Sequence, residues 1–213
     1  MKHTVITGHY GSGKTNIAVN LALEAAKKTD KKVYLIDADI VNPYFRSADN
    51  ENLLAEAGVK LIAPMSANTN LDIPAMPATV MKVFNTDCEV IWDIGGDDSG
   101  AVVLGRYSDD IKKQGYEMIY TVNFYRPMTS TEDDMISLLY DIEAASHLKA
   151  TAIVNNSNLG ADTDREIVEA SKEKAARLSE ITKLPVKFTS VDEKLARDIP
   201  ECKPIKMVTK KLW

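Results

Sequence analysis

Eight residues near the amino end of the sequence, Gly8 to Thr15, have the types and spacing of a loop that binds phosphate. They match the pattern G-x-x-x-x-G-K-[ST]. Glycines let the backbone turn its N–H groups toward an anion, and the amino terminus of a following helix adds a favourable dipole. The lysine places its charge on the β- and γ-phosphates, and the threonine hydroxyl is a ligand for Mg²⁺. The motif predicts a catalytic role for Lys14, a metal-binding role for Thr15, and nucleotide contacts from Gly8, His9, Tyr10, Gly11, Ser12, Gly13, Lys14, Thr15 and the adjacent Asn16.

Carboxylates follow two other apolar runs of the sequence. Asp37 and Asp39 come directly after one run, and Asp93 lies near the end of another. Hydrolysis at a phosphate loop needs a carboxylate that holds Mg²⁺ and a group that orients the attacking water. The pattern predicts that Asp93 is catalytic and binds the metal, that Asp39 is catalytic through the water, and that Asp37 supports the metal. The alternative is that these acids cap helices or end strands in solvent.

Short apolar runs rich in Val and Ile alternate with segments of helical spacing. Such runs are typical of strands buried on both faces of a parallel sheet. We expect strands at residues 4–7, 33–36, 59–62, 90–94, 118–122, 151–154 and 186–188, and helices at 16–28, 47–57, 129–146 and 163–182. This alternation predicts an α/β fold of three layers, a mostly parallel β-sheet with helices on both faces, in a single nucleotide-binding domain of residues 1–213. Ligands bind such sheets at the carboxyl ends of the strands.

The composition argues against several classes of protein. The chain has 213 residues, a net charge of −5 and a pI of about 5.3, and an acidic chain argues against a general role in binding nucleic acid. The two cysteines, Cys88 and Cys202, form no C-x-x-C pair, so we expect no disulfide framework and no zinc or iron–sulfur site. We expect Cys88 to lie in the core. No stretch of about 18 apolar residues occurs, and we expect a cytoplasmic protein.

Taken together, these residues resemble the MinD/ParA-type P-loop ATPases, the class that also holds nitrogenase iron protein. The resemblance covers most of the chain and rests on the loop Gly8–Thr15, on Asp37-Ala38-Asp39 as switch I, and on Asp93-Ile94-Gly95-Gly96 as switch II. It implies a Mg²⁺-dependent ATPase whose switch segments respond to the γ-phosphate and are read by a protein partner. It also implies that Asn155 hydrogen-bonds the base, although a capping role for this residue stays open.

The chain departs from the family's pattern at the second position of the loop. Most members have a lysine there, which reaches across a dimer to the partner's nucleotide, and this chain has His9. The nucleotide-sandwich homodimer is therefore an open question, and hydrolysis could be slow or need a partner. The guanine motif N-K-x-D is absent, because Ser157 follows Asn156, which favours ATP over GTP.

Three further segments could carry specificity. The aromatic and basic residues of 42–46 could form a partner surface or pack into the core, and Arg126 follows a strand at the ligand-facing edge, where it could reach a phosphate or pair with an acid. The basic tail from Lys203 to Trp213 would present Ile205, Val208 and Leu212 on one face if it were helical. That face could touch a membrane, but the tail is short and contains Pro204, which favours an ordered or frayed end instead.

The leading hypothesis is an ATPase that acts as a nucleotide-dependent switch for a protein partner. A second hypothesis is a small-molecule kinase or ligase-type enzyme, for which Arg46, Arg106 and Arg126 are the candidate acceptor-site arginines. A third is a scaffold that binds nucleotide and hydrolyses little, which His9 favours. The fold alone does not choose among them.

Overall fold

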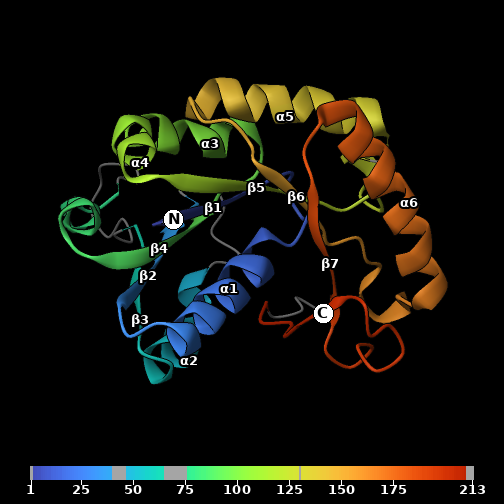
Figure 1. Cartoon of the computed structure of the whole chain (residues 1–213), viewed down its shortest axis with the longest axis horizontal. Helices are drawn as coiled ribbons and strands as arrows, with labels where there is room; N and C mark the ends of the chain where they lie inside the picture. Colours follow the sequence, from blue (N-terminus) through green and yellow to red (C-terminus); the bar gives the residue numbers. More distant parts are fainter. Residues whose placement is uncertain (1, 40–46, 65–75, 130, 210–213) are drawn as a thin grey trace, which may run out of the picture.

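The computed structural model describes residues 2–39, 47–64, 76–129 and 131–209. Within these residues eight parallel strands form one sheet in the order β3-β2-β4-β1-β5-β6-β7-β8 (Figure 1). The strands are β1 His3–Thr7, β2 Lys32–Ala38, β3 Val59–Ile62, β4 Cys88–Ile94, β5 Tyr116–Val122, β6 Ala152–Asn155, β7 Val186–Asp192 and β8 Lys203–Ile205. Because β1 lies in the interior between β4 and β5, the loop that follows it lies near the middle of the carboxyl edge of the sheet.

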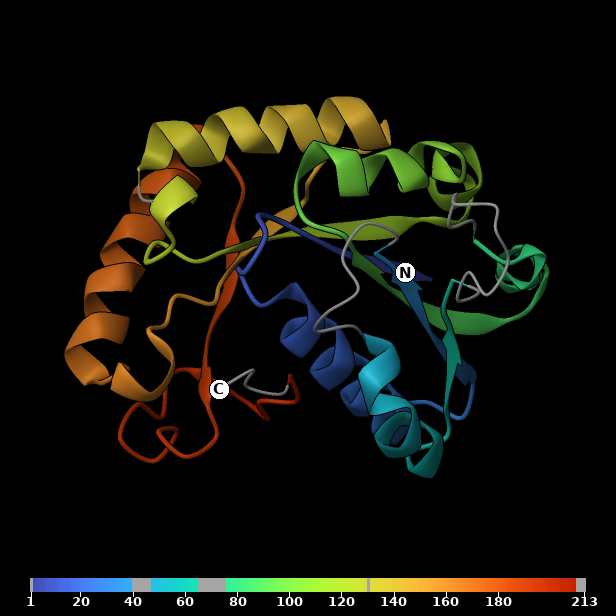
Figure 2. The same ribbon diagram turned by 180° about the vertical axis from the view of Figure 1, so that it is seen from behind.

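Helices cover both faces of this sheet. They are α1 Lys14–Lys28, α2 Glu51–Glu56, α3 Asp97–Gly105, α4 Ser108–Gln114, α5 Glu132–Ser146 and α6 Arg165–Thr182, with 3₁₀ turns at Ser47–Asn50, Ala78–Asn85, Pro127–Thr129 and Gly160–Asp162. Figures 1 and 2 show α1 and α2 on one side of the sheet and α3, α4 and α5 on the other. The predicted three-layer α/β fold with a parallel sheet is confirmed.

The alternation of side chains along each strand builds two cores. On β1, Val5 packs into the core under α3, α4 and α5, and the next residue, Ile6, packs into the core under α1 and α2. Both side chains are fully buried. This is why the strands are apolar at successive positions: each face of the sheet has a helical layer to bury against. Cys88 is buried in the first core, as predicted.

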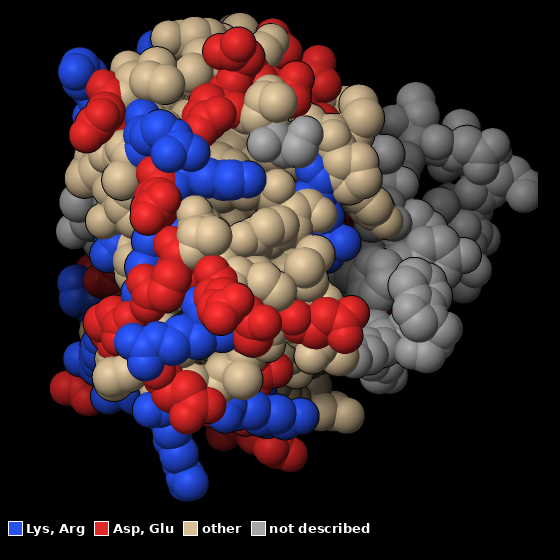
Figure 3. Space-filling view, turned by 90° about the vertical axis from the view of Figure 1, so that its right-hand side faces the viewer, with Lys and Arg blue, Asp and Glu red and all other residues tan. Residues whose placement is uncertain are grey.

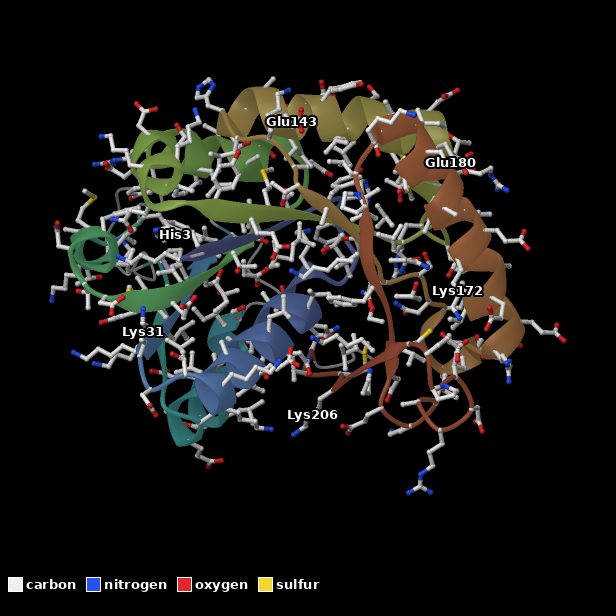
Figure 4. All side chains as sticks on the ribbon, in the orientation of Figure 1. His3, Lys31, Glu143, Lys172, Glu180 and Lys206 are labelled. Carbon is white, nitrogen blue, oxygen red and sulfur yellow. The ribbon has the colours of Figure 1, made fainter. Side chains whose placement is uncertain are left out.

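The amino ends of the strands close around a buried polar cluster. His3, labelled in Figure 4, lies at the start of β1 and is fully buried. Trp92 Nε1 donates to His3 Nδ1 at 3.2 Å, which leaves the proton of the neutral ring on Nε2, 2.9 Å from Gln114 Oε1. Burial lowers the pKa of His3 below its usual value. This end of the sheet is structural, since the phosphate loop lies at the opposite end.

Most predicted helices occur, with shifted boundaries that their caps explain. The helix expected from residue 129 starts at Glu132, because the Thr131 hydroxyl oxygen accepts the N–H of Asp134 at 3.2 Å. The helix expected from residue 163 starts at Arg165, because the Asp164 carboxylate accepts the N–H of Ile167 at 2.8 Å. The segment 47–57 is a 3₁₀ turn that continues into α2.

The helices α3 and α4 and the strand β8 were not predicted. The tail was expected to be an ordered or frayed end, and the helix considered as its alternative does not occur where the structure describes the tail. Lys203–Ile205 is a strand that pairs with β7, and Pro204 fits there because β8 is the last strand of the sheet. The remaining tail residues 210–213 and the segment 40–46, which includes Arg46, lie outside the described residues.

The surface over α6 carries charges of both signs. Figure 3 shows basic and acidic side chains interspersed on this face, without a basic stripe among its described residues. Ion pairs such as Lys172 with Glu169 and Glu201, and Arg177 with Glu132, account for part of this mixing. None of the described helices is long and apolar enough to cross a membrane.

Candidate functional site: the loop after β1

The loop from Gly8 to Thr15 leaves β1 and enters α1, as its motif requires. Gly8, Gly11 and Gly13 have φ values of 142°, 75° and 87°, which residues with side chains rarely adopt. Gly13 is also the residue that precedes α1, and no side chain caps that helix. The uncapped N–H groups of the first turn therefore face the space enclosed by the loop, where an anion would satisfy them.

At two of these positions, neighbouring atoms also leave no room for a side chain. A Cβ on Gly8 would lie 2.2 Å from the backbone oxygen of Thr121 on β5. A Cβ on Gly13 would lie 2.1 Å from the side-chain nitrogen of Asn156, which donates to the backbone oxygen of Ser12 at 2.7 Å. The strands on one side of β1 thus press directly on the loop and fix its shape.

Lys14 is buried at the start of α1 and folds back over the loop. Its Nζ donates to the backbone oxygen of His9 at 3.0 Å, and 7% of the residue is exposed. Burial lowers the pKa of Lys14 below its usual value, and the carboxylates of Asp93, Asp39 and Asp97 oppose that shift. The ammonium group is thus held inside the loop, close to three acids and within reach of an anion.

Asp93 lies in β4 one residue before its end and is 2% exposed. Its Oδ2 accepts the Ser47 hydroxyl at 2.7 Å, while its buried Oδ1 has no hydrogen-bond partner among the described residues. Burial raises the pKa of this carboxyl from 3.8 to about 6, and the Ser47 hydrogen bond, the nearby Thr15 hydroxyl and the charge of Lys14 counteract the rise. An unbonded buried carboxylate oxygen beside a threonine hydroxyl fits the donor set of a Mg²⁺ site.

Asp37 and Asp39 lie on the neighbouring strand and just past it. Asp37 is fully buried and stands directly opposite Asp93 in the register of β2 and β4. One of its oxygens accepts the N–H of Asp39 at 3.2 Å. The Asp39 carboxylate lies against Gly95, since a Cβ on that glycine would be 3.0 Å from Asp39 Oδ1. The three predicted acids therefore converge on one side of the loop.

The segment after β4 crosses the loop and touches it. A Cβ on Gly96 would lie 2.9 Å from the backbone nitrogen of Tyr10. Asp97 has a φ of 65°, which is uncommon for a residue with a side chain, and its Oδ1 lies 3.4 Å from the Tyr10 N–H and 3.7 Å from His9 Nε2. Asp97 was considered only as part of a segment that could carry specificity and was not predicted to bind nucleotide or metal, yet the structure places its carboxylate at the loop.

His9 and Tyr10 occupy the exposed rim of the loop. His9 Nδ1 lies 2.6 Å from the backbone oxygen of Tyr10, and Tyr10 is 50% exposed. The His9 ring therefore turns along its own loop and toward Asp97. In this structure the ring extends neither across the loop nor away from it.

Arg126 joins the site from the turn that follows β5. Its Nε donates to the backbone oxygen of Gly11 at 2.9 Å, and its carbon atoms pack along that glycine. Of the two other arginines considered, Arg46 lies outside the described residues, and Arg106 follows α3 at the end away from the loop, with its Cζ 5.9 Å from the centre of the Tyr107 ring. Among the described residues Arg126 is therefore the arginine that contacts the loop.

Asn155 and Asn16, both predicted to contact the nucleotide, use their side chains within the protein. Asn155 is fully buried, and its amide nitrogen donates to Ser171 at 2.8 Å while its oxygen accepts the N–H of Ser157. The structure therefore gives no support to base binding by Asn155. Asn16 Oδ1 accepts the backbone N–H groups of Val208 and Thr209, so its side chain holds the tail.

Two polar residues of the site were missed by sequence reasoning. Ser47 bonds Asp93 across 46 positions of sequence, and nothing in its local pattern indicated this. Asn156 could have been found, because it follows Asn155 and adjacent residues of an extended chain point in opposite directions. Although the three predicted acids lie on the same side of the loop, no three His, Cys, Asp or Glu side chains in the described part of the chain are arranged to hold a metal ion by themselves.

Comparison with known proteins defines the fold. No protein-family model matches the chain, and no curated protein matches it. Among solved structures it is similar to the signal recognition particle receptor FtsY from Elizabethkingia anophelis in complex with GDP, with a TM-score of 0.55 and 21% identity over 91% of this chain and 58% of that one. It is also similar to cell division protein FtsY from Thermotoga maritima, with a TM-score of 0.59 and 20% identity over 95% of this chain and 64% of that one.

A third similar structure is a nucleotide-binding protein from Archaeoglobus fulgidus in complex with ADP. It has a TM-score of 0.54 and 17% identity, and the match covers 92% of this chain and 84% of that one. This chain has the P-loop NTPase fold. It spans less than two thirds of the length of either FtsY protein, and membership of the MinD/ParA-type group within the fold stays a prediction.

Proposed function

We propose that this protein is a Mg²⁺-dependent ATPase that acts as a nucleotide-dependent switch for a protein partner. The observation that carries the proposal is the convergence of Lys14, Thr15 and Asp93 behind a loop of three left-handed glycines. A Gly-rich turn that binds nothing would have no reason to bury a lysine and to leave an oxygen of a buried aspartate without a partner. A bound nucleotide would give the Lys14 ammonium group a phosphate to pair with, and its metal would give the Asp93 oxygen a partner.

Each residue then has a task that its position allows. Lys14, held inside the loop, places its charge on the β- and γ-phosphates. Thr15 and Asp93 hold Mg²⁺, with Asp37 in support, and the metal supplies charge neutralisation at the phosphates. Asp39 orients the water that attacks the γ-phosphate, because its carboxylate lies at the backbone of Gly95 on the same side of the loop. The N–H groups at the start of α1 stabilise the charge on the phosphates.

The switch role rests on the contacts between the loop and the segment after β4. Gly96 and Asp97 lie against Tyr10, and Asp97 leads directly into α3. A γ-phosphate in the loop would add charge next to the Asp97 carboxylate and displace it, which moves the start of α3. Loss of the γ-phosphate would let it return. A protein partner that contacts α3 could read the difference.

ATP is proposed over GTP on the absence of an N-K-x-D motif and on the resemblance to MinD/ParA-type ATPases. The similar structures include complexes with GDP and with ADP, so they support a nucleotide without choosing the base. The Arg106 contact with Tyr107 lies away from the loop and does not favour a kinase acceptor site.

A calorimetric titration tests the nucleotide and its metal. We expect wild-type protein to bind ATP more tightly than GTP, and more tightly with Mg²⁺ than with a chelator present. Asp93→Asn, which keeps the size of the side chain and an acceptor for Ser47, should lose most of the Mg²⁺ dependence. Equal affinity for ATP with and without Mg²⁺ would contradict the metal site, and tighter binding of GTP would overturn the choice of ATP.

A further inference from the structure

The turn that carries Arg126 is held by hydrogen bonds and buried neighbours, and it places one exposed cation beside the phosphate loop. The side-chain oxygen of Asn123 accepts the N–H of Tyr125 at 3.0 Å, and its backbone oxygen accepts the Arg126 N–H at 3.3 Å. Phe124 and Thr129 on either side are buried. The turn is therefore fixed on both sides of Arg126, and only the long side chain is free to move.

The guanidinium group keeps most of its hydrogen-bonding capacity unused. Its Nε donates to Gly11, and its two terminal nitrogens have no hydrogen bond or ion pair among the described residues. The nearest loop residue, Gly11, has no side chain to stand between Arg126 and the loop interior. An exposed arginine that is ordered against a neutral carbonyl gains little stability by itself, since ordering it costs side-chain entropy.

The charges around the loop favour one more cation when a polyphosphate binds. The carboxylates of Asp39, Asp93 and Asp97 act on Lys14, which is the other cation at the loop among the residues that the structure describes. A nucleoside polyphosphate adds further negative charge there. Arginine suits this situation because its planar fork can donate two hydrogen bonds to a phosphate while its stem stays packed.

We propose that Arg126 binds the phosphate chain of the nucleotide in cis, from the side of the loop that faces β5. The inference rests on the proposed function, because it assumes that a nucleotide occupies the loop. The Nε contact with Gly11 positions the guanidinium group, and the terminal nitrogens donate to the phosphate oxygens. Arg126, on the turn after β5, thereby supplies a second cation to the loop. The second position of this loop is His9, where most members of the family that the chain resembles have a lysine.

The test compares equilibrium binding of Mg²⁺ and a non-hydrolysable ATP analogue at several salt concentrations. The proteins are wild type, Arg126→Gln, Arg126→Lys and, as a matched control, Arg165→Gln. Arg165 is also exposed and also donates to a backbone oxygen, that of Asp198 at 3.2 Å, but it lies on α6. Arg126→Gln should weaken binding by ~10–100-fold and reduce its salt dependence. Arg126→Lys should recover part of both, and the control should match wild type.

Two results would overturn this inference while leaving the proposed function in place. One is an Arg126→Gln variant that binds as tightly as wild type. The other is an equal loss in the Gln and Lys variants with unchanged salt dependence, which would mean that Arg126 only shapes the loop through Gly11. Wild-type protein that binds no nucleotide would instead refute the proposed function itself.

Discussion

The carboxyl of Asp93 gives the site a pH dependence whose sign can be worked out. Its pKa rises from 3.8 to about 6 in the folded, ligand-free protein, chiefly because it is buried. The folded state therefore holds a proton that the unfolded state releases between these values. This group stabilises the fold fully at acidic pH below its unfolded pKa, and the contribution is lost as the pH rises through about 6.

Asp93→Asn removes this titration, so we predict that it alters the pH profile of stability. As the pH rises from 4 to 7, wild type should lose up to about 2–3 kcal/mol of unfolding free energy relative to the Asn variant. Urea denaturation of both proteins across this range measures the difference. If the stability of the two proteins changed with pH in the same way, Asp93 would have an ordinary pKa, and one argument for a preformed metal site would be lost.

Side-chain direction explains why some site residues could be predicted and others could not. The positions of Lys14, Thr15 and Asp93 in the fold could be predicted because the loop motif and the strand ends determine where these residues lie, and their roles stay predictions. Asn155 was placed by resemblance, and the structure turns its amide toward Ser171 on α6. Its neighbour Asn156 faces the loop instead. Adjacent residues of an extended chain point to opposite sides, and the sequence alone does not specify which of the two asparagines faces the loop.

At the level of elements, α3 packs directly on the backbone of the segment that follows β4, and we predict that this contact would carry the state of the loop to α3. Gly100 is buried, and a Cβ there would lie 2.4 Å from the backbone oxygen of Gly95. We predict that Gly100→Ala forces α3 away from Gly95, costs about 1–3 kcal/mol of stability and reduces ATP hydrolysis. Ser99→Ala, at an exposed neighbour in the same helix, is the control. Denaturation and hydrolysis by both variants check this, and a Gly100→Ala protein that matches the control would contradict the close contact.

The elements found from sequence were those whose pattern is set by burial alone. Strands such as β2 and β4 are apolar at successive positions because helices cover both faces, and that pattern needs no knowledge of the partner. α3 and α4 were missed because glycines interrupt the first and the second is short and polar. β8 was missed because three residues around a proline carry no periodicity, and its place is set by pairing with β7.

At the level of the whole molecule, the carboxyl-terminal segment is bound to the phosphate-loop helix. Asn20 accepts the N–H of Lys206 at 2.9 Å and donates to its backbone oxygen at 2.8 Å, while Asn16 accepts from Val208 and Thr209. Figure 4 labels Lys206 next to α1. Residues 206–209 are thus held against the helix that begins at Lys14.

We predict that replacing both asparagines, in Asn16→Ala with Asn20→Ala, frees this segment. The expected cost is about 2–4 kcal/mol of unfolding free energy, because several backbone groups lose their partners together. Asn85→Ala, whose amide lies 3.5 Å from a carbonyl four residues away, is the control and should be near neutral. Thermal denaturation and limited proteolysis near residue 206 report the change. Equal stability and equal protection in the two proteins would show that the tail contributes nothing to the fold.

We propose that the loop after β1 hydrolyses a Mg²⁺-bound nucleoside triphosphate. The most direct test is the rate of Mg²⁺-dependent ATP hydrolysis measured against protein concentration, with Lys14→Ala as the control. We predict a rate that is present in wild type, that depends on Mg²⁺ and that is lost in the variant. Specific activity that rises with concentration would add that the active species is a dimer. A wild-type rate equal to that of Lys14→Ala at every concentration would contradict intrinsic hydrolysis by this loop.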